Sequence, residues 1–258
     1  MIRVGVSVNS FVASGGGGFD ADYQAVLNYA TTQGYTLPSA GQQTLQNQLL
    51  VDLKTAGVWS KLDTFAVFAT NGSSDFALID WIRLSQYTAV NSPTFTTNVG
   101  FQGNGTSSYV DTNFNPSTSG VNYTLNNASR YFFPHAFSGT GRMDGNTSGN
   151  VNSITRQSVT TQRINSSANN LALAFDYTVV INPKSIHRTS SVSVDLYNGI
   201  VGTTGVQTSV AIFSSNQFVL RSGTSYAAHT ASAYAIGASL VAENTDFVNA
   251  YNTYKSAI

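Results

Sequence analysis

The chain has 258 residues, enough for one large domain, and its twelve basic and twelve acidic residues give a net charge of zero. Without a basic patch it has no electrostatic footprint for nucleic acid or an anionic membrane, and without cysteine it has no disulfide or thiolate metal site. Charged residues make up only 9% of the chain, while serine, threonine and asparagine supply 85 of the 258 residues, a composition typical of extracellular or particle-borne β-sandwiches.

The first 18 residues are predicted to form a docking arm and a flexible joint. Val4, Val6 and Val8 alternate with small residues, which is the period-two pattern of a strand. The four glycines at 15–18 behave as a flexible joint. A disordered tail is the alternative.

Residues 19–61 are predicted to form a helical hairpin. Asp20 can cap a first helix over 21–32, and Ser39 can cap a second helix whose leucines recur every four residues. Two short amphipathic helices need something to cover their apolar faces. We therefore predict that the chain forms an oligomer through the arm or the hairpin, with Leu49 and Trp59 among the contacts; the alternative is that the hairpin packs on its own β body.

Residues 62–258 are predicted to form the β body, which closes with a short helix over 243–256. Short strand-like runs are separated by Gly/Asn turns, a pattern typical of two packed antiparallel sheets. The runs lie at 63–70, 77–84, 94–101, 108–112, 122–133, 151–157, 171–181, 192–197, 210–214, 218–221 and 232–240. The fold class predicted from this pattern is a mainly-β jelly-roll sandwich of the concanavalin A type.

Four segments together resemble structural proteins of tailed bacteriophages that carry a laminin-G-like, concanavalin A-like jelly roll. They are LLVDLKTAGVWSKLD (49–63), GFQGNGTSSYVDTNFNPST (100–118), NYTLNNASRYFF (122–133) and YAIGASLVAENTDFVNAYNTY (234–254). The resemblance covers roughly residues 19–258. It implies a jelly roll in a virion and implies no catalytic residue.

The enzymatic alternatives lack their usual residues. A glycoside hydrolase needs a pair of carboxylates, but Glu243 is the single glutamate and no strand carries two acids at a suitable spacing. A serine hydrolase needs a nucleophile motif that is absent here, and His135, His187 and His229 are far apart in the sequence. We predict a protein that is not an enzyme and needs no cofactor.

Calcium is the one metal for which the sequence offers candidates. Asp144 and Asn146 flank a glycine, and Asp111 with Asn113 at the end of the predicted run 108–112 is a second possibility. In both places carboxylate and amide oxygens of the kind Ca²⁺ prefers lie close in sequence. The competing interpretation of Asp-Gly-Asn is a turn in which these side chains bond their own backbone.

The sequence leaves three functions open. The first is a non-enzymatic virion protein, decorating a capsid or forming part of a tail or fibre, whose partners are further copies of itself, other virion proteins and host surface glycans. The second is a secreted carbohydrate-binding module, since the 13 tyrosines and many asparagines are the residue types that stack on and bond to sugars. Tyr197 and Tyr226 fit a core or turn position equally well, so composition does not choose a site. The third is a glycoside hydrolase or lyase.

Overall fold

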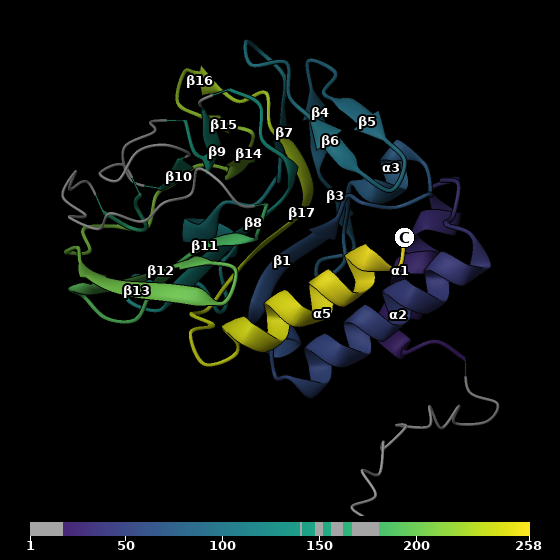
Figure 1. Cartoon of the computed structure of the whole chain (residues 1–258), viewed down its shortest axis with the longest axis horizontal. Coiled ribbons are helices and arrows are strands. Elements are labelled where there is room, and N and C mark those ends of the chain that lie inside the picture. The colour runs from purple at the N-terminus through teal and green to yellow at the C-terminus, as the bar shows by residue number, and fades with distance from the viewer. Residues whose placement is uncertain (1–17, 140, 148–151, 156–161, 167–180) are drawn as a thin grey trace, which may run out of the picture.

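A computed structural model describes residues 18–139, 141–147, 152–155, 162–166 and 181–258. Two antiparallel sheets share one core, and helices cover the other face of the larger sheet (Figure 1). The helices are α1 (Ala21–Thr32), α2 (Ala40–Thr55), α3 (Ser74–Ala77), α4 (Pro116–Ser119) and α5 (Asn244–Ser256), with a 3-10 turn at Trp59–Lys61. None of the helices described is both long enough and apolar enough to cross a membrane.

The larger sheet has eight strands. Seven run in the order β13-β12-β11-β8-β17-β6-β5, and β1 also pairs with β17. Because β6 pairs with the first residues of β17 and β1 with its later residues, the two strands follow one another along the same edge of β17. The strands are β1 (Leu62–Val67), β5 (Thr94–Thr96), β6 (Gly100–Gln102), β8 (Ala128–Ala136), β11 (Lys184–Arg188), β12 (Ser193–Asn198), β13 (Val201–Val206) and β17 (Thr230–Gly237).

The smaller sheet has five strands in the order β10-β9-β14-β7-β4, and two short hairpins flank the sheets. Its strands are β4 (Thr88–Val90), β7 (Tyr109–Asp111), β9 (Arg142–Gly145), β10 (Ser153–Thr155) and β14 (Phe218–Val219). The hairpins are β2 (Ile79–Asp80) with β3 (Ser85–Gln86), and β15 (Arg221–Ser222) with β16 (Ser225–Tyr226). A mainly-β, sandwich-like architecture is therefore confirmed.

The larger sheet is the middle layer, because its central strands bury side chains on both faces. On β8, Phe132 faces the smaller sheet, whereas Tyr131 and Phe133 face the helices. On β17 the helix-facing positions are Ala233 and Ala235, which leave room for the aromatic side chains of α5. Because both faces of these strands are covered, residues 128–134 and 230–237 are buried at every position.

The helical hairpin forms as predicted and packs on its own sheet. Asp20 accepts a hydrogen bond from the amide of Asp22, and Ser39 accepts one from the amide of Gln42, so both predicted caps are present. Helix α2 lies beside α5 across the sheet (Figure 1). Leu49 is 1% exposed in this interface, so its proposed role as a free docking residue is wrong.

The structure describes Trp59, the second predicted docking residue of the hairpin, but not the N-terminal arm. Trp59 is half-buried against the helical core, and its indole Nε1 donates to Asp22 Oδ2 at 3.1 Å. Its side chain is therefore engaged within the chain. Val4, Val6 and Val8 lie outside the described residues.

Several strand assignments differ from the prediction. Residues 77–84 form the end of α3 and the short strand β2, and residues 210–214 form no strand. Conversely, β13 occupies a segment with two glycines that lies outside every predicted strand run. Gly202 is required there because a Cβ would lie 2.4 Å from the ring of Tyr197. Most of the predicted run 171–181 lies outside the described residues.

Candidate functional site

The smaller sheet turns a set of aromatic and polar side chains away from the core. Val110 of β7 and Val219 of β14 point into the sandwich and are fully buried. Because side chains alternate along a strand, Tyr109, Asp111 and Phe218 point to the opposite face. Phe218 lies directly opposite Asp111 in the strand pairing, so these side chains are neighbours.

The β15–β16 hairpin adds an arginine and a second tyrosine to this face. The guanidinium carbon of Arg221 lies 4.5 Å from the ring centroid of Tyr109, 4.7 Å from that of Phe218 and 5.4 Å from that of Tyr226. The ring of Tyr109 is 5.1 Å from Phe218 and 6.1 Å from Tyr226. We call Tyr109, Asp111, Phe218, Arg221 and Tyr226 the aromatic face.

Polar atoms on the aromatic face retain unused hydrogen-bonding capacity. Asp111 Oδ1 accepts from the amide of Asn113 at 2.8 Å and from Asn216 Nδ2 at 3.0 Å. Arg221 donates from Nε to the carbonyl of Gly223 at 3.0 Å. Within the described residues, Asp111 Oδ2, the terminal amino groups of Arg221 and both tyrosine hydroxyls make no hydrogen bond. Tyr109, Arg221 and Tyr226 are each partly exposed.

Opposing effects act on the pKa of Asp111, the carboxyl of the aromatic face. Burial raises the pKa of Asp111, while its two hydrogen bonds and the positive charge of Arg221 act in the opposite direction. The face therefore offers one cation and one partly buried carboxyl close together, beside aromatic rings.

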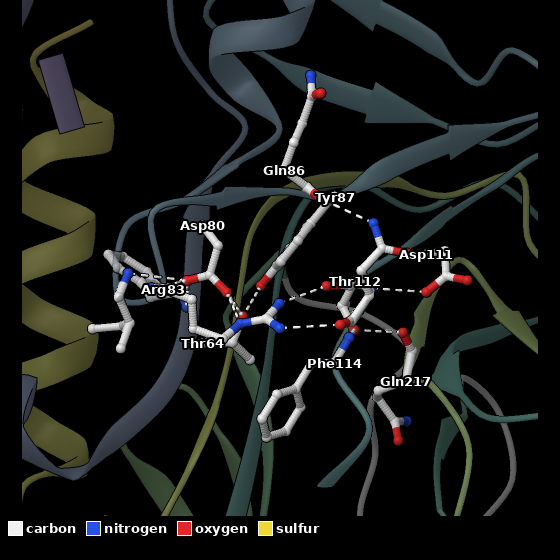
Figure 2. A network of polar contacts seen from close by, with 12 residues as sticks. Thr64, Asp80, Arg83, Gln86, Tyr87, Asp111, Thr112, Phe114 and Gln217 are labelled. Carbon is white, nitrogen blue, oxygen red and sulfur yellow. Dashed lines mark hydrogen bonds and ion pairs between the residues drawn. The ribbon is translucent and has the colours of Figure 1, made fainter. Parts of the chain in front are cut away.

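A polar network holds β7 in place beneath the face (Figure 2). Asp80 Oδ2 accepts from Arg83 Nε at 2.6 Å and from Thr64 Oγ1 at 2.5 Å, and Thr64 Oγ1 also contacts the hydroxyl of Tyr87. Arg83 then donates to the carbonyl of Thr112 at 2.8 Å, directly after β7. The network joins the two sheets, and its members are too buried or too fully bonded to bind a ligand.

The calcium prediction at Asp144 is wrong. Asp144 lies on β9 instead of in a turn, and its carboxylate is fully buried. Oδ2 accepts from Arg130 at 2.8 Å and from the hydroxyl of Tyr234 at 2.7 Å, and Oδ1 accepts from the amide of Ile154 at 2.6 Å. Burial raises the pKa of Asp144, and the Arg130 charge opposes that shift.

The other calcium candidates do not join Asp144. Asn146 is buried, and its carbonyl accepts from the amide of Gly223 at 2.7 Å. Asp111 and Asp144 point to opposite faces of the same sheet, since Asp111 is paired with Phe218 and Asp144 with Val219. No cluster of three or more potential metal ligands occurs among the described residues.

The sandwich interior holds another buried arginine, Arg188, which was not expected from the sequence. Arg188 of β11 is fully buried. Its guanidinium donates to the carbonyls of Ile164 at 2.7 Å, Gln207 at 2.7 Å and Ser190 at 3.2 Å. These contacts close the loops at one end of the sandwich, which is a structural role.

His187 lies on β11 and is fully buried. Its Nδ1 accepts from the amide of Leu240 at 3.2 Å, so the proton of the neutral ring is on Nε2, which lies 2.9 Å from Ser185 Oγ. Burial lowers the pKa of His187 to about 3. Both residues are enclosed in the protein, so this serine–histidine pair has no access to a substrate.

The remaining candidates lie apart from the aromatic face. Glu243 precedes α5, and its carboxylate is 2.7 Å from Lys61 Nζ. Burial lowers the pKa of His135 at the end of β8, and His229 is buried with Nδ1 accepting from the amide of Ser138 at 3.2 Å. Asp111 and Tyr226 were candidates for different sites in the sequence, and strand pairing brings both to the aromatic face.

Neither the family models nor the curated proteins contain a match to this sequence. Among solved structures, the chain is similar to domain 4 of AbnA, an extracellular arabinanase of Geobacillus stearothermophilus in complex with arabinotriose. The TM-score is 0.44 at 10% identity, covering 73% of this chain and 98% of that one. It is also similar to Trypanosoma rangeli sialidase in complex with 2,3-difluorosialic acid, with a TM-score of 0.39 at 10% identity, covering 81% of this chain and 39% of that one.

These similarities are remote, and the function has to be inferred from this chain's own side chains. The resemblance to tailed-phage structural proteins gains no support from the comparisons.

Proposed function

We propose that the chain is a carbohydrate-binding protein without catalytic activity, built on a jelly roll of the concanavalin A type, and that it binds glycans on the aromatic face. The observation that carries the proposal is the grouping of Tyr109, Phe218 and Tyr226 around Arg221, with Asp111 beside them.

The chemistry of the face suits a sugar. A pyranose or furanose ring presents an apolar face that packs on an aromatic side chain, and its hydroxyls both donate and accept hydrogen bonds. Tyr226 supplies a partly exposed ring, the terminal amino groups of Arg221 supply donors, and Asp111 Oδ2 supplies an acceptor. A single cation beside a carboxyl is a poor match for a polyanion such as nucleic acid.

The absence of catalysis is part of the proposal. Hydrolysis of a glycosidic bond generally requires two carboxyl groups that flank the bond. Asp111 is the acid of the aromatic face, whereas Asp144 points to the other side of the sheet and pairs with Arg130. Glu243, the single glutamate, pairs with Lys61.

A glycan array read with the full chain tests the proposal. We expect the wild type to bind a defined subset of glycans, and Tyr226→Ala and Arg221→Gln each to weaken that binding roughly tenfold or more, equivalent to about 1.4 kcal/mol. Tyr29→Ala is the matched control, because Tyr29 is a partly exposed tyrosine of the helical layer. Binding that survives both changes on the aromatic face, or that is lost in the control, would contradict the site.

A second proposal concerns where the protein works. We propose, from the sequence resemblance, that it is carried on a phage particle, where glycan binding would serve attachment to a host surface. The segments of resemblance contain β6 and β7 and parts of α2, β8, β17 and α5, so they contribute to every layer of the described structure. Quantitative mass spectrometry of purified particles should find a fixed copy number. Its absence from the particles would rule out this role.

A further inference from the structure

Strand β13 is an edge of the larger sheet and lacks the usual protection of an edge. It pairs with β12 through six consecutive residue pairs without a bulge. Within the part of the chain that the structure describes, no strand pairs with its other side. Natural edge strands are commonly guarded by charged residues, proline, bulges or a covering segment. The sequence of β13, VGTTGV, contains neither a charge nor a proline.

Exposed aliphatic side chains gather around this edge. Val206 is 75% exposed and Val201 68% exposed. Of the eight large hydrophobic side chains found exposed in the described residues, five lie on β13, on its turn from β12 or on the segments that flank these strands. The five are Val192, Ile200, Val201, Val206 and Val210. Exposed aliphatic side chains concentrated along one unpaired edge favour an interaction there.

We propose that β13 pairs with β13 of a second copy of this chain, in an antiparallel arrangement that joins the two larger sheets. The free backbone groups of an edge strand are complementary to those of an antiparallel copy. A two-fold axis makes the same patch serve both subunits. The absence of charge on β13 favours this pairing, because like charges directly opposite each other would oppose it.

The register of this pairing follows from symmetry. Directly opposite residues in an antiparallel pair project to the same face, so a two-fold axis perpendicular to the sheet passes beside one residue and its own copy. An axis at Thr203 places Ile200 opposite Val206 of the second copy, and Val201 opposite Gly205 of the second copy. Every exposed aliphatic side chain of the strand then meets an aliphatic or a small residue.

An axis at Thr204 fits less well. It would place Val201 opposite Gln207, and Val206 opposite Gly202. The hydroxyl of Thr204 already donates to Asp195 of β12, whereas Thr203 has no hydrogen bond from its side chain in the described structure. Opposed threonines can hydrogen-bond across a strand pair. We therefore assign the axis to Thr203.

Light scattering of the full chain at micromolar concentration tests the interface. The wild type should have twice the 27.4 kDa mass of one chain, and Val206→Lys should be monomeric while keeping its circular dichroism spectrum. Val121→Lys is the matched control, since Val121 is 84% exposed in a loop beside β1, and it should remain dimeric. A monomeric wild type, or a dimer that survives Val206→Lys, would overturn the proposal.

Disulfide trapping tests the register independently of stability. The chain has no cysteine, so a single introduced thiol can cross-link only between copies. Directly opposite residues lie within the Cα separation of about 4.4–6.8 Å that a disulfide spans. Under a mild oxidant, Thr203→Cys should form a covalent dimer, while Val121→Cys and Thr204→Cys should not. Cross-linking of Thr204→Cys without Thr203→Cys would overturn the assigned axis.

Discussion

The guanidinium of Arg221 lies over the ring of Tyr109, with 4.5 Å between the guanidinium carbon and the ring centroid. Two further rings lie close to the same guanidinium, so one planar cation orders three aromatic side chains from β7, β14 and β16. The arrangement depends on the shape of arginine as well as its charge, because a planar guanidinium packs flat on a ring and a lysine ammonium does not.

Replacing Arg221 should therefore disturb the aromatic face even when the charge is kept. We expect Arg221→Lys to lower the free energy of unfolding by about 0.5–2 kcal/mol and to weaken glycan binding. Urea denaturation and a binding titration measure the two effects.

Arg221→Gln also removes the positive charge near Asp111. The pKa of Asp111 should therefore rise, which a carboxyl NMR titration would detect. An unchanged Asp111 pKa would mean that the charges are not coupled.

Breaking the buried pair of Arg130 and Asp144 should be costly. Asp144→Asn leaves the Arg130 charge without its counter-ion in the sandwich core, and we expect a loss of about 3–5 kcal/mol in the free energy of unfolding. Asp246→Asn, at an exposed position of α5, is the control and should change little. Added Ca²⁺ should leave the denaturation midpoint of the wild type unchanged. A calcium-dependent rise that Asp144→Asn abolishes would restore the metal site.

Leu49 should behave as a core residue. Leu49→Ala creates a cavity between α2 and α5, and we expect a loss of about 2–5 kcal/mol in urea denaturation. Leu45→Ala, at a partly exposed position one turn earlier, should cost less. Neither change should alter the mass measured by light scattering. Dissociation of an oligomer without loss of stability would instead indicate that the hairpin is an interface.

The buried imidazole of His187 should make stability depend on pH. Burial holds its folded-state pKa at about 3, below the ordinary value of 6.5. As the pH falls below 6.5, the unfolded chain takes up a proton that the folded chain refuses, so the free energy of unfolding decreases. The limiting slope is about 1.4 kcal/mol per pH unit. Denaturation of the wild type and of His187→Gln between about pH 7 and pH 5 should differ in slope. Parallel curves would show that His187 titrates normally in the fold.

Ser222 packs so closely against Gly145 that no side chain fits at position 145. A Cβ at this position would lie 2.0 Å from Ser222 Oγ and 2.2 Å from Ser222 Cβ. We expect Gly145→Ala to separate β9 from β15, lowering the thermal midpoint and weakening glycan binding together. Gly41→Ala in α2 meets nothing within 4 Å and should stabilise the protein by up to about 1 kcal/mol. Equal midpoints for the two variants would contradict the packing argument.

Local signals were enough to predict the two helices of the hairpin. The caps at Asp20 and Ser39 and the i+4 leucines depend on residues close in sequence, and the first helix has the predicted bounds. Strand β9 could not be predicted in the same way. Asp144-Gly145 has the composition of a turn, but the glycine is selected by Ser222, which is far along the chain.

The candidate site could not be predicted from the sequence, because its residues are brought together by strands that pair across long stretches of the chain. Asp111 and Tyr226 each had an equally good local interpretation, and their neighbourhood follows from the pairing of β7 with β14 and of β15 with β16. Buried arginines such as Arg130 and Arg188 were missed because a charged residue in sequence normally indicates an exposed position. Their partners are carbonyl and carboxylate oxygens supplied by other parts of the fold.

The position of β17 in the chain constrains how the protein can be made. Residues 230–237 pair with β1, β6 and β8, and they contribute to the hydrophobic core on both faces of the larger sheet. A ribosome synthesises them after β1, β6 and β8, so neither core can close until residues 230–237 have been made. Until then the nascent chain exposes unpaired strands, which favours chaperone binding. Polypeptides that stop just before Thr230 should remain unfolded and be degraded, as should those that stop much earlier.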